Sequence, residues 1–222
     1  MLMIYQESLD FLKDLAEHNS REWFAANKER YEKARENVID FTTTILEGVR
    51  KIEAGMDENL DAKKCVMRIY RDIRFSKNKA PYKNNFGVSF PTSGLKGGGV
   101  EYYLHIQPGN SFIGGGYWMP EAPHLKAIRQ EIDYNAADLK KIIDDKDFVK
   151  LFGDFRAQEQ LKSLPKGYEA DNENLDLIKL KSFVGWHKLT DKDLTQAGSE
   201  KIIIDMCSRI HPLNVFLKNA LA

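Results

Sequence analysis

The chain lacks three features that often announce a function: a surplus of charge, a cysteine framework and a long apolar run. Its 33 Lys and Arg residues balance 33 Asp and Glu residues, so no overall attraction to nucleic acid or membrane surfaces is expected. Its two cysteines, Cys65 and Cys207, lie far apart and match no ligand or redox spacing, which predicts core residues in a reducing compartment. No secretion signal and no apolar run of about 18 residues is present. We therefore expect a cytoplasmic protein without a membrane segment.

Several common enzyme motifs are also missing. The glycine triplets at residues 97–99 and 114–116 are not followed by Lys-Ser or Lys-Thr, so neither is a nucleotide P-loop. The sequence contains no Gly-x-Ser-x-Gly nucleophile elbow and no His-Glu-x-x-His zinc motif. Its five histidines show no metal-ligand spacing. We therefore expect no metal site and no cofactor.

The N-terminal part of the chain has a helical pattern. Hydrophobic residues between Phe24 and Ile52 recur at steps of three, four and seven, which is typical of one long amphipathic helix ending near Gly55. Asn19 or Ser20 is expected to cap this helix, and Ser8 to cap a shorter helix before it. With 222 residues, of which 42% are hydrophobic, the chain is predicted to fold as a single domain, residues 1–222.

The hydrophobic period changes to two after residue 65, which indicates strands. Strands are predicted over residues 65–75, 86–90, 100–106 and 111–118, with a fifth candidate at residues 180–188. Helices follow at residues 121–134, 136–145 and 148–152. A capping box of Thr190 and Asp193 precedes a last helix that opens at Ser199 and bends at Pro212. The predicted class is α+β: a central antiparallel sheet of about four to five strands with one face packed by helices, including the long N-terminal helix and the C-terminal helix.

Residues 68–83, the arginine segment, carry the densest positive charge. Residues 63–83 contain eight basic side chains and one acid, Asp72. The predicted strand at residues 65–75 places Arg71 on the apolar face of the sheet, where an unpaired guanidinium would cost several kcal/mol. Arg71 is therefore predicted to form a structural ion pair, with Glu36 or Asp40 as candidate partners.

The opposite, polar face of the predicted sheet presents further candidates for a site. Alternation places Ser89, Glu101, Tyr103 and His105 on this face, beside Arg68, Tyr70, Asp72 and Arg74. Such a face can border a cleft, and the glycines at position 87 and at residues 114–116 would let a ligand or another backbone approach closely.

The leading interpretation is recognition of a small anion, a phosphate or a carboxylate. The planar fork of arginine donates two parallel hydrogen bonds to either group. Asp72 and Tyr82 are expected to orient the arginines, and Asp72 and His105 are also candidate catalytic residues, although no spacing identifies an enzyme. The predicted ligand-binding residues are Arg68, Arg74, Lys77, Lys79, Tyr82 and Tyr103.

Two other interpretations remain open. The first is a structural or protein-interaction domain whose arginines are paired internally. The second is single-stranded nucleic-acid binding, in which Tyr70, Tyr103 and Tyr117 would stack on bases. Because the chain is neutral overall, no specific nucleic-acid partner is expected.

The motif Arg68-x-x-Arg71-Asp72-x-Arg74-Phe75, followed by Asn78-Lys79-x-x-Tyr82, resembles a bacterial family of conserved hypothetical proteins, domain of unknown function 2461. The resemblance extends over nearly the whole chain and includes Trp23-Phe24, the stretch at residues 114–120 and the loop at residues 165–168. This family has no settled activity, substrate or cofactor. The resemblance therefore implies a single cytoplasmic domain of about this length and assigns no catalytic role.

Overall fold

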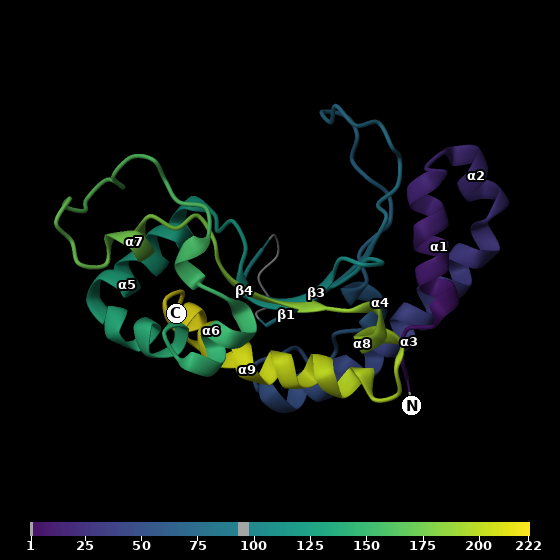
Figure 1. Ribbon diagram of the computed structural model, residues 1–222. Coiled ribbons are helices and arrows are strands. Elements are labelled where there is room, and N and C mark those ends of the chain that lie inside the picture. Colours follow the sequence, from purple (N-terminus) through teal and green to yellow (C-terminus); the bar gives the residue numbers. More distant parts are fainter. Residues whose placement is uncertain (1, 93–97) are drawn as a thin grey trace.

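An antiparallel sheet of four strands lies at the centre of the computed structural model, which describes residues 2–92 and 98–222 (Figure 1). The strands pair in chain order, β1 with β2, β2 with β3 and β3 with β4. Their bounds are β1 Phe86–Pro91, β2 Glu101–Ile106, β3 Ser111–Tyr117 and β4 Phe183–Leu189. The prediction of an α+β fold around a central antiparallel sheet is confirmed.

The register of the sheet separates an apolar face from a polar face. Val88 pairs with Leu104, and Leu104 pairs with Ile113; these three side chains are almost completely buried. The next pair in the register, Ser89 with Tyr103, lies on the opposite face. The period of two seen in the sequence therefore gave the correct faces for β1 and β2.

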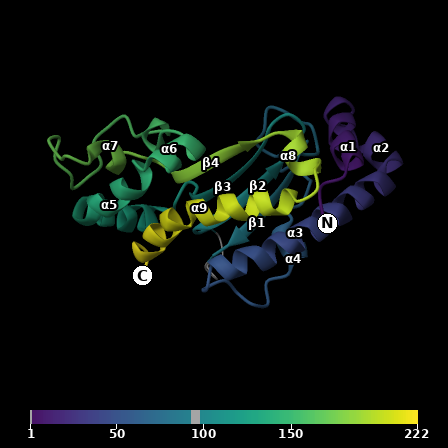
Figure 2. The same ribbon diagram turned by 60° about the horizontal axis from the view of Figure 1, so that its bottom comes forward.

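Two long helices cover the apolar face. Helices α3 (Lys28–Ile52) and α9 (Ser199–Asn219) pack against each other, and they contact β1 and β3 respectively. Figure 2 shows both helices in front of the sheet. Gly115 allows α9 to approach closely, because a Cβ atom there would lie 2.9 Å from a methyl group of Ile210. Within residues 2–92 and 98–222, Figure 1 shows no comparable helix layer on the opposite face of the sheet, which leaves room for a site.

The N-terminal helices differ from the prediction at two positions. The expected single helix is divided into α2 (Arg21–Ala26) and α3 at Asn27, whose amide donates to the carbonyl of Trp23 at 2.9 Å. Ser20 caps α2, as one of the two predicted options. Ser8 caps no helix: α1 (Gln6–Glu17) begins before it, and the buried Ser8 hydroxyl donates instead to Asn37.

Helices after the third strand largely follow the prediction. The two expected helices at residues 121–145 form one element, α5 (Ala122–Ile143), with a kink at the non-helical residue Asn135. The capping box of Thr190 and Asp193 opens α8 (Asp191–Thr195), and Pro212 lies inside α9. The remaining elements are α4 (Ala62–Cys65), α6 (Lys146–Phe152), η1 (Phe155–Ala157) and α7 (Leu175–Ile178). Within the described ranges, no helix is both long enough and apolar enough to cross a lipid bilayer.

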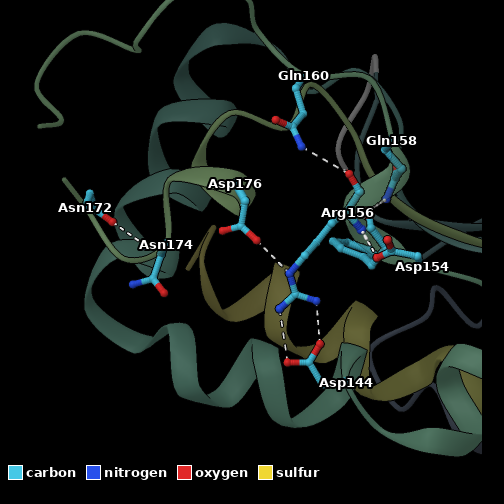
Figure 3. A network of polar contacts seen from close by, with 9 residues as sticks. Asp144, Asp154, Arg156, Gln158, Gln160, Asn172, Asn174 and Asp176 are labelled. Carbon is cyan, nitrogen blue, oxygen red and sulfur yellow. Dashed lines mark hydrogen bonds and ion pairs between the residues drawn. The ribbon is translucent and has the colours of Figure 1, made fainter. Parts of the chain in front are cut away.

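An arginine network holds the irregular segment between α6 and β4. Arg156 donates to Asp144 at the end of α5 at 2.5 Å and to Asp176 of α7 at 2.8 Å (Figure 3). These two carboxylates and the two hydrogen bonds to Asp144 fix the guanidinium plane. The network therefore positions η1, whose following residue Gln158 accepts a hydrogen bond from the backbone of Val184 in β4.

The arginine segment is not a strand, so the predicted strand at residues 65–75 is wrong. Only isolated bridges occur there, Val66 with Val88 and Tyr70 with Tyr82. The segment folds back on itself instead: the Arg71 amide donates to the Pro81 carbonyl at 2.9 Å and the Lys83 amide to the Ile69 carbonyl at 2.8 Å. It projects from the sheet face opposite α3 and α9 (Figure 1), so it forms a wall beside the polar face.

Candidate functional site

A cleft of about 800 Å³ lies on the polar face of the sheet. The arginine segment contributes Arg71, Asp72 and Lys83 to its lining, and the central strands contribute the floor. Trp118 and Trp186 also line the cleft, from the end of β3 and from β4. A volume of this size lies within the range of about 300–1,000 Å³ found for small-molecule pockets.

Aromatic rings in mutual contact form much of the floor. His105 stacks on Phe112 with ring centroids 4.7 Å apart, and the rings of Phe112 and Trp186 form a T-shaped pair with centroids 5.4 Å apart. Trp186 in turn lies 5.5 Å from Trp118, whose side chain is 60% exposed. Tryptophan is normally buried for most of its area. Two partly exposed tryptophans side by side therefore offer a surface for a planar or apolar ligand.

Three side chains of β2 that face the cleft, Glu101, Tyr103 and His105, form a polar row. They occupy alternate positions of the strand. The Tyr103 hydroxyl lies 3.3 Å from Nδ1 of His105, and Nε2 of His105 lies 2.9 Å from Oε1 of Gln107. Because the Gln107 oxygen can only accept, Nε2 carries the imidazole proton and Nδ1 accepts from Tyr103.

Burial changes the proton affinity of this row. It lowers the pKa of His105, which the positive charge of Lys83 also lowers while the Gln107 hydrogen bond opposes the shift. Burial raises the pKa of Tyr103, and the negative charge of Glu101 adds to that shift. Both groups are therefore held in their neutral forms near neutral pH.

Glu101 is a half-buried carboxyl group without a cationic partner among the described residues. In the described part of the chain its carboxyl group has one side-chain hydrogen-bond partner, Ser89 on the neighbouring strand, which donates to Oε2. Burial raises the pKa of Glu101, and the Ser89 hydrogen bond only partly offsets the shift. A carboxyl group held in this way inside a cleft is a candidate acid or base.

The cationic part of the cleft is formed by Lys83 and Arg71. Burial lowers the pKa of Lys83, and the nearby positive charge of Arg68 lowers it further. The guanidinium of Arg71 donates to the Ala80 carbonyl at 3.0 Å and approaches the Ser76 hydroxyl at 3.4 Å. Across residues 2–92 and 98–222, neither cation has a carboxylate within ion-pair distance.

The predicted ion pair of Arg71 with Glu36 or Asp40 is therefore absent from the described part of the chain. The prediction depended on a strand at residues 65–75 that would bury Arg71, and that strand does not form. Arg71 is instead only half-buried, and backbone and hydroxyl oxygens satisfy its guanidinium. These hydrogen bonds join Arg71 to the returning part of the arginine segment, at Ser76 and Ala80.

The predicted ligand-binding residues do not gather in one place. Of these, only Tyr103 lines the cleft. Arg74 is bound to Asp72 through Nε at 3.0 Å and through a terminal nitrogen at 2.6 Å, and Lys79 donates to the Ile73 carbonyl at 3.0 Å. Tyr82 is buried. Arg68 and Lys77 are exposed outside the cleft lining.

Both candidate catalytic residues, Asp72 and His105, do line the cleft. Hydrogen bonds from Arg74 lower the pKa of Asp72, so this carboxylate is held in its charged form by an ion pair with Arg74. His105 retains its contact with Tyr103. Among the residues that the structure describes, no group of three or more His, Cys, Asp or Glu side chains could hold a metal ion.

The glycines of the sheet make room for protein atoms. A Cβ atom at Gly87 would lie 2.6 Å from the Tyr103 hydroxyl, and one at Gly114 would lie 2.6 Å from the Gly185 carbonyl. Of the two options considered from the sequence, close approach by other parts of the chain thus accounts for both positions. Gly97 of the other triplet lies outside the described residues.

Sequence reasoning missed the aromatic side of the site. It assigned no binding role to Trp118, Trp186 or Phe112, and it did not include Lys83 among the predicted ligand-binding residues. A signal was present in Trp118, which follows a glycine-rich strand and lies two residues before Pro120. Periodicity cannot assign a large side chain to the core at such a position. The remaining partners come from distant parts of the chain.

The family model described as "Conserved hypothetical protein (DUF2461)" matches residues 7–216. No curated protein and no solved structure matches the chain.

Proposed function

The chain belongs to the conserved hypothetical protein family DUF2461, and we propose that its cleft binds a small molecule with an anionic group on a planar or apolar body. The anionic group would contact Lys83, with Arg71 adding positive charge, and the body would lie on Trp118 and Trp186. The proposed ligand is still an anion, as predicted from the sequence, but the residues proposed to bind it are different.

The observation that carries this proposal is the position of Lys83. Lys83 lines an aromatic cleft, and its ammonium group has no carboxylate partner among the described residues. Burial makes its charged form less favourable. A bound phosphate or carboxylate would offset that cost with a charge-assisted hydrogen bond.

The exposed arginines are less suited to this role. Arg74 already makes a two-pronged contact with Asp72, and releasing it would leave that carboxylate without its partner. This contact supports internal pairing for Arg74 itself. Lys83 and Arg71, by contrast, line the cleft together.

Isothermal titration calorimetry tests the proposal with a panel of nucleotides, sugar phosphates and aryl carboxylates. We expect at least one member to bind more tightly than about 1 mM. Lys83→Gln should weaken that binding by roughly 10-fold to 150-fold, the equivalent of one charge-assisted hydrogen bond of about 1.5–3 kcal/mol. Trp186→Ala should weaken binding of ligands with an aromatic body.

Lys77→Gln is the matched control, because it removes the same charge from the exposed turn of the arginine segment. It should leave the dissociation constant unchanged. Absence of any binding across the panel, or equal loss of affinity in both lysine variants, would rule out an anion site at Lys83.

A further inference from the structure

The geometry points to proton transfer in the same cleft: we propose that Tyr103 and Glu101 interconvert the keto and enol forms of an aryl-substituted 2-keto acid. Tyr103 would accept a proton with the help of His105, and Glu101 would donate one. This inference rests on the proposed function, since the same Lys83 and tryptophans would hold the substrate.

A hydrogen-bonded chain supplies the base. The Tyr103 hydroxyl is directed at Nδ1 of His105, and Gln107 fixes the tautomer that leaves Nδ1 free to accept. Stacking on Phe112, with an interplanar angle of 7°, holds the imidazole plane. The Tyr103 oxygen can thus take a proton from a substrate while its own proton passes to His105. The neutral forms of Tyr103 and His105, which burial favours, are the forms that this transfer requires.

Glu101 supplies the acid next to this base. It lies two residues from Tyr103 on the same face of β2, a separation of about 7 Å between backbone positions. Its carboxyl group leans toward Ser89, which pairs with Tyr103 in the register. Its raised pKa increases the protonated fraction near neutral pH. The cleft thus holds an acid and a base at alternate positions of one strand, the pair of groups that the proposed transfer requires.

The surroundings of the row select the substrate class. Lys83 and His105 line the same cleft, so a substrate carboxylate on Lys83 would lie in the cleft that holds the base. The aromatic group would rest on Trp186, which contacts Phe112 beside His105, with Trp118 next to it. An arylpyruvate combines a carboxylate, an adjacent ketone, an acidic C–H bond and a planar ring.

The step is balanced without another reactant. The C–H bond next to the ketone breaks, and its proton joins the Tyr103 oxygen while the Tyr103 proton moves to Nδ1 of His105. The released electron pair forms the C=C bond, and the carbonyl π pair moves to oxygen, which takes the proton of Glu101. The product is the enol. Reversal of these transfers returns the keto form, and exchange with water restores the starting protonation of His105 and Glu101.

Ultraviolet absorbance of the enol of phenylpyruvate provides the test, with 4-hydroxyphenylpyruvate and indole-3-pyruvate as further probes. We expect the wild-type protein to accelerate tautomerisation above the buffer rate. Tyr103→Phe and Glu101→Gln should each lower kcat by about 100-fold or more, within the usual range for general acid–base catalysis. Calorimetry should show that both variants still bind the probe, and thermal melts should show that both are folded.

Tyr134→Phe is the control, because Tyr134 is 75% exposed and does not line the cleft; it should keep wild-type activity. Binding of an arylpyruvate without acceleration, or full activity in Tyr103→Phe and Glu101→Gln, would overturn the catalytic inference and leave the binding proposal intact. Binding of phosphates but of no arylpyruvate would overturn the substrate class. If Lys83→Gln abolishes binding of the probe while Tyr103→Phe and Glu101→Gln keep wild-type activity, the binding proposal is supported and the catalytic inference is wrong.

Discussion

The ring of Tyr82 lies almost parallel to the ring of Phe24, with centroids 4.0 Å apart and an interplanar angle of 11°. Asn19 bonds to the backbone on both sides of the same residue: its amide donates to the Tyr82 carbonyl at 3.1 Å, and its oxygen accepts from the Tyr82 amide at 3.0 Å. These contacts join the arginine segment to the N-terminal helices. Tyr82 therefore anchors one wall of the cleft.

Tyr82→Ala is expected to lower the free energy of unfolding by about 3–5 kcal/mol, the usual cost of removing a buried aromatic ring. Tyr82→Phe keeps the stacked ring and should cost less than about 1 kcal/mol. Urea denaturation followed by tryptophan fluorescence measures both, with the exposed Tyr134→Ala as control. Similar stabilities for Tyr82→Ala and Tyr134→Ala would contradict the anchoring role.

Arg71→Gln tests whether Arg71 stabilises the arginine segment through hydrogen bonds to neutral oxygens or through a buried ion pair. Since the Arg71 guanidinium donates to the Ala80 carbonyl and leaves no carboxylate stranded, we expect a loss of only about 1.5 kcal/mol. A buried ion pair would cost about 3–5 kcal/mol when one partner is removed. Hydrogen exchange should become faster in residues 72–80 and remain unchanged in the sheet. A loss above 3 kcal/mol would indicate a buried acid partner.

The sequence predicted those parts of the fold that depend on local periodicity. Val88 and Leu104 revealed their buried face by alternation, and Thr190 with Asp193 revealed a helix start by spacing. The same alternation failed in the arginine segment. There Tyr82 finds its partner in Phe24 of α2, and Pro81, which has no amide hydrogen, cannot extend a ladder.

The candidate site was predictable only where it follows a single strand. Glu101, Tyr103 and His105 share a face because they alternate along β2. Lys83 and Trp186 meet them through tertiary folding, since one precedes the sheet and the other follows three intervening helices and a 3₁₀ turn along the described chain. No pattern in the local sequence indicates that these distant residues line the same cleft.

Gly116→Ala should destabilise the sheet beneath the cleft by about 3 kcal/mol. Gly116 has a φ angle of +125°, and a Cβ atom there would lie 2.0 Å from the Phe183 carbonyl oxygen. Neither the backbone strain nor the clash with a paired strand can be relieved by a side-chain rotation. Gly55→Ala is the control, because no described atom beyond its two chain neighbours lies within 4 Å of the added Cβ. Thermal melts of the two variants that agree within error would contradict the geometry of β3 and β4.

Glu101 and His105 should change the free energy of unfolding with pH in opposite directions. The pKa of Glu101 is raised in the folded protein, so the folded state binds more protons than the unfolded state above about pH 4.5, the ordinary pKa of the group. Glu101 therefore makes the protein less stable as pH rises from that value through its folded pKa. The pKa of His105 is lowered, so His105 makes the protein less stable as pH falls below about 6.5, its ordinary value.

Urea denaturation between pH 4 and pH 8 separates the two effects. Relative to Glu101→Gln, the wild-type protein should lose unfolding free energy as pH rises above 4.5. Relative to His105→Gln, it should lose unfolding free energy as pH falls below 6.5. Glu169→Gln, at an exposed position outside the cleft, should parallel the wild-type curve. If the Glu101→Gln curve also parallels the wild type throughout, the Glu101 carboxyl group is not desolvated, and the acid assigned to the cleft loses its physical basis.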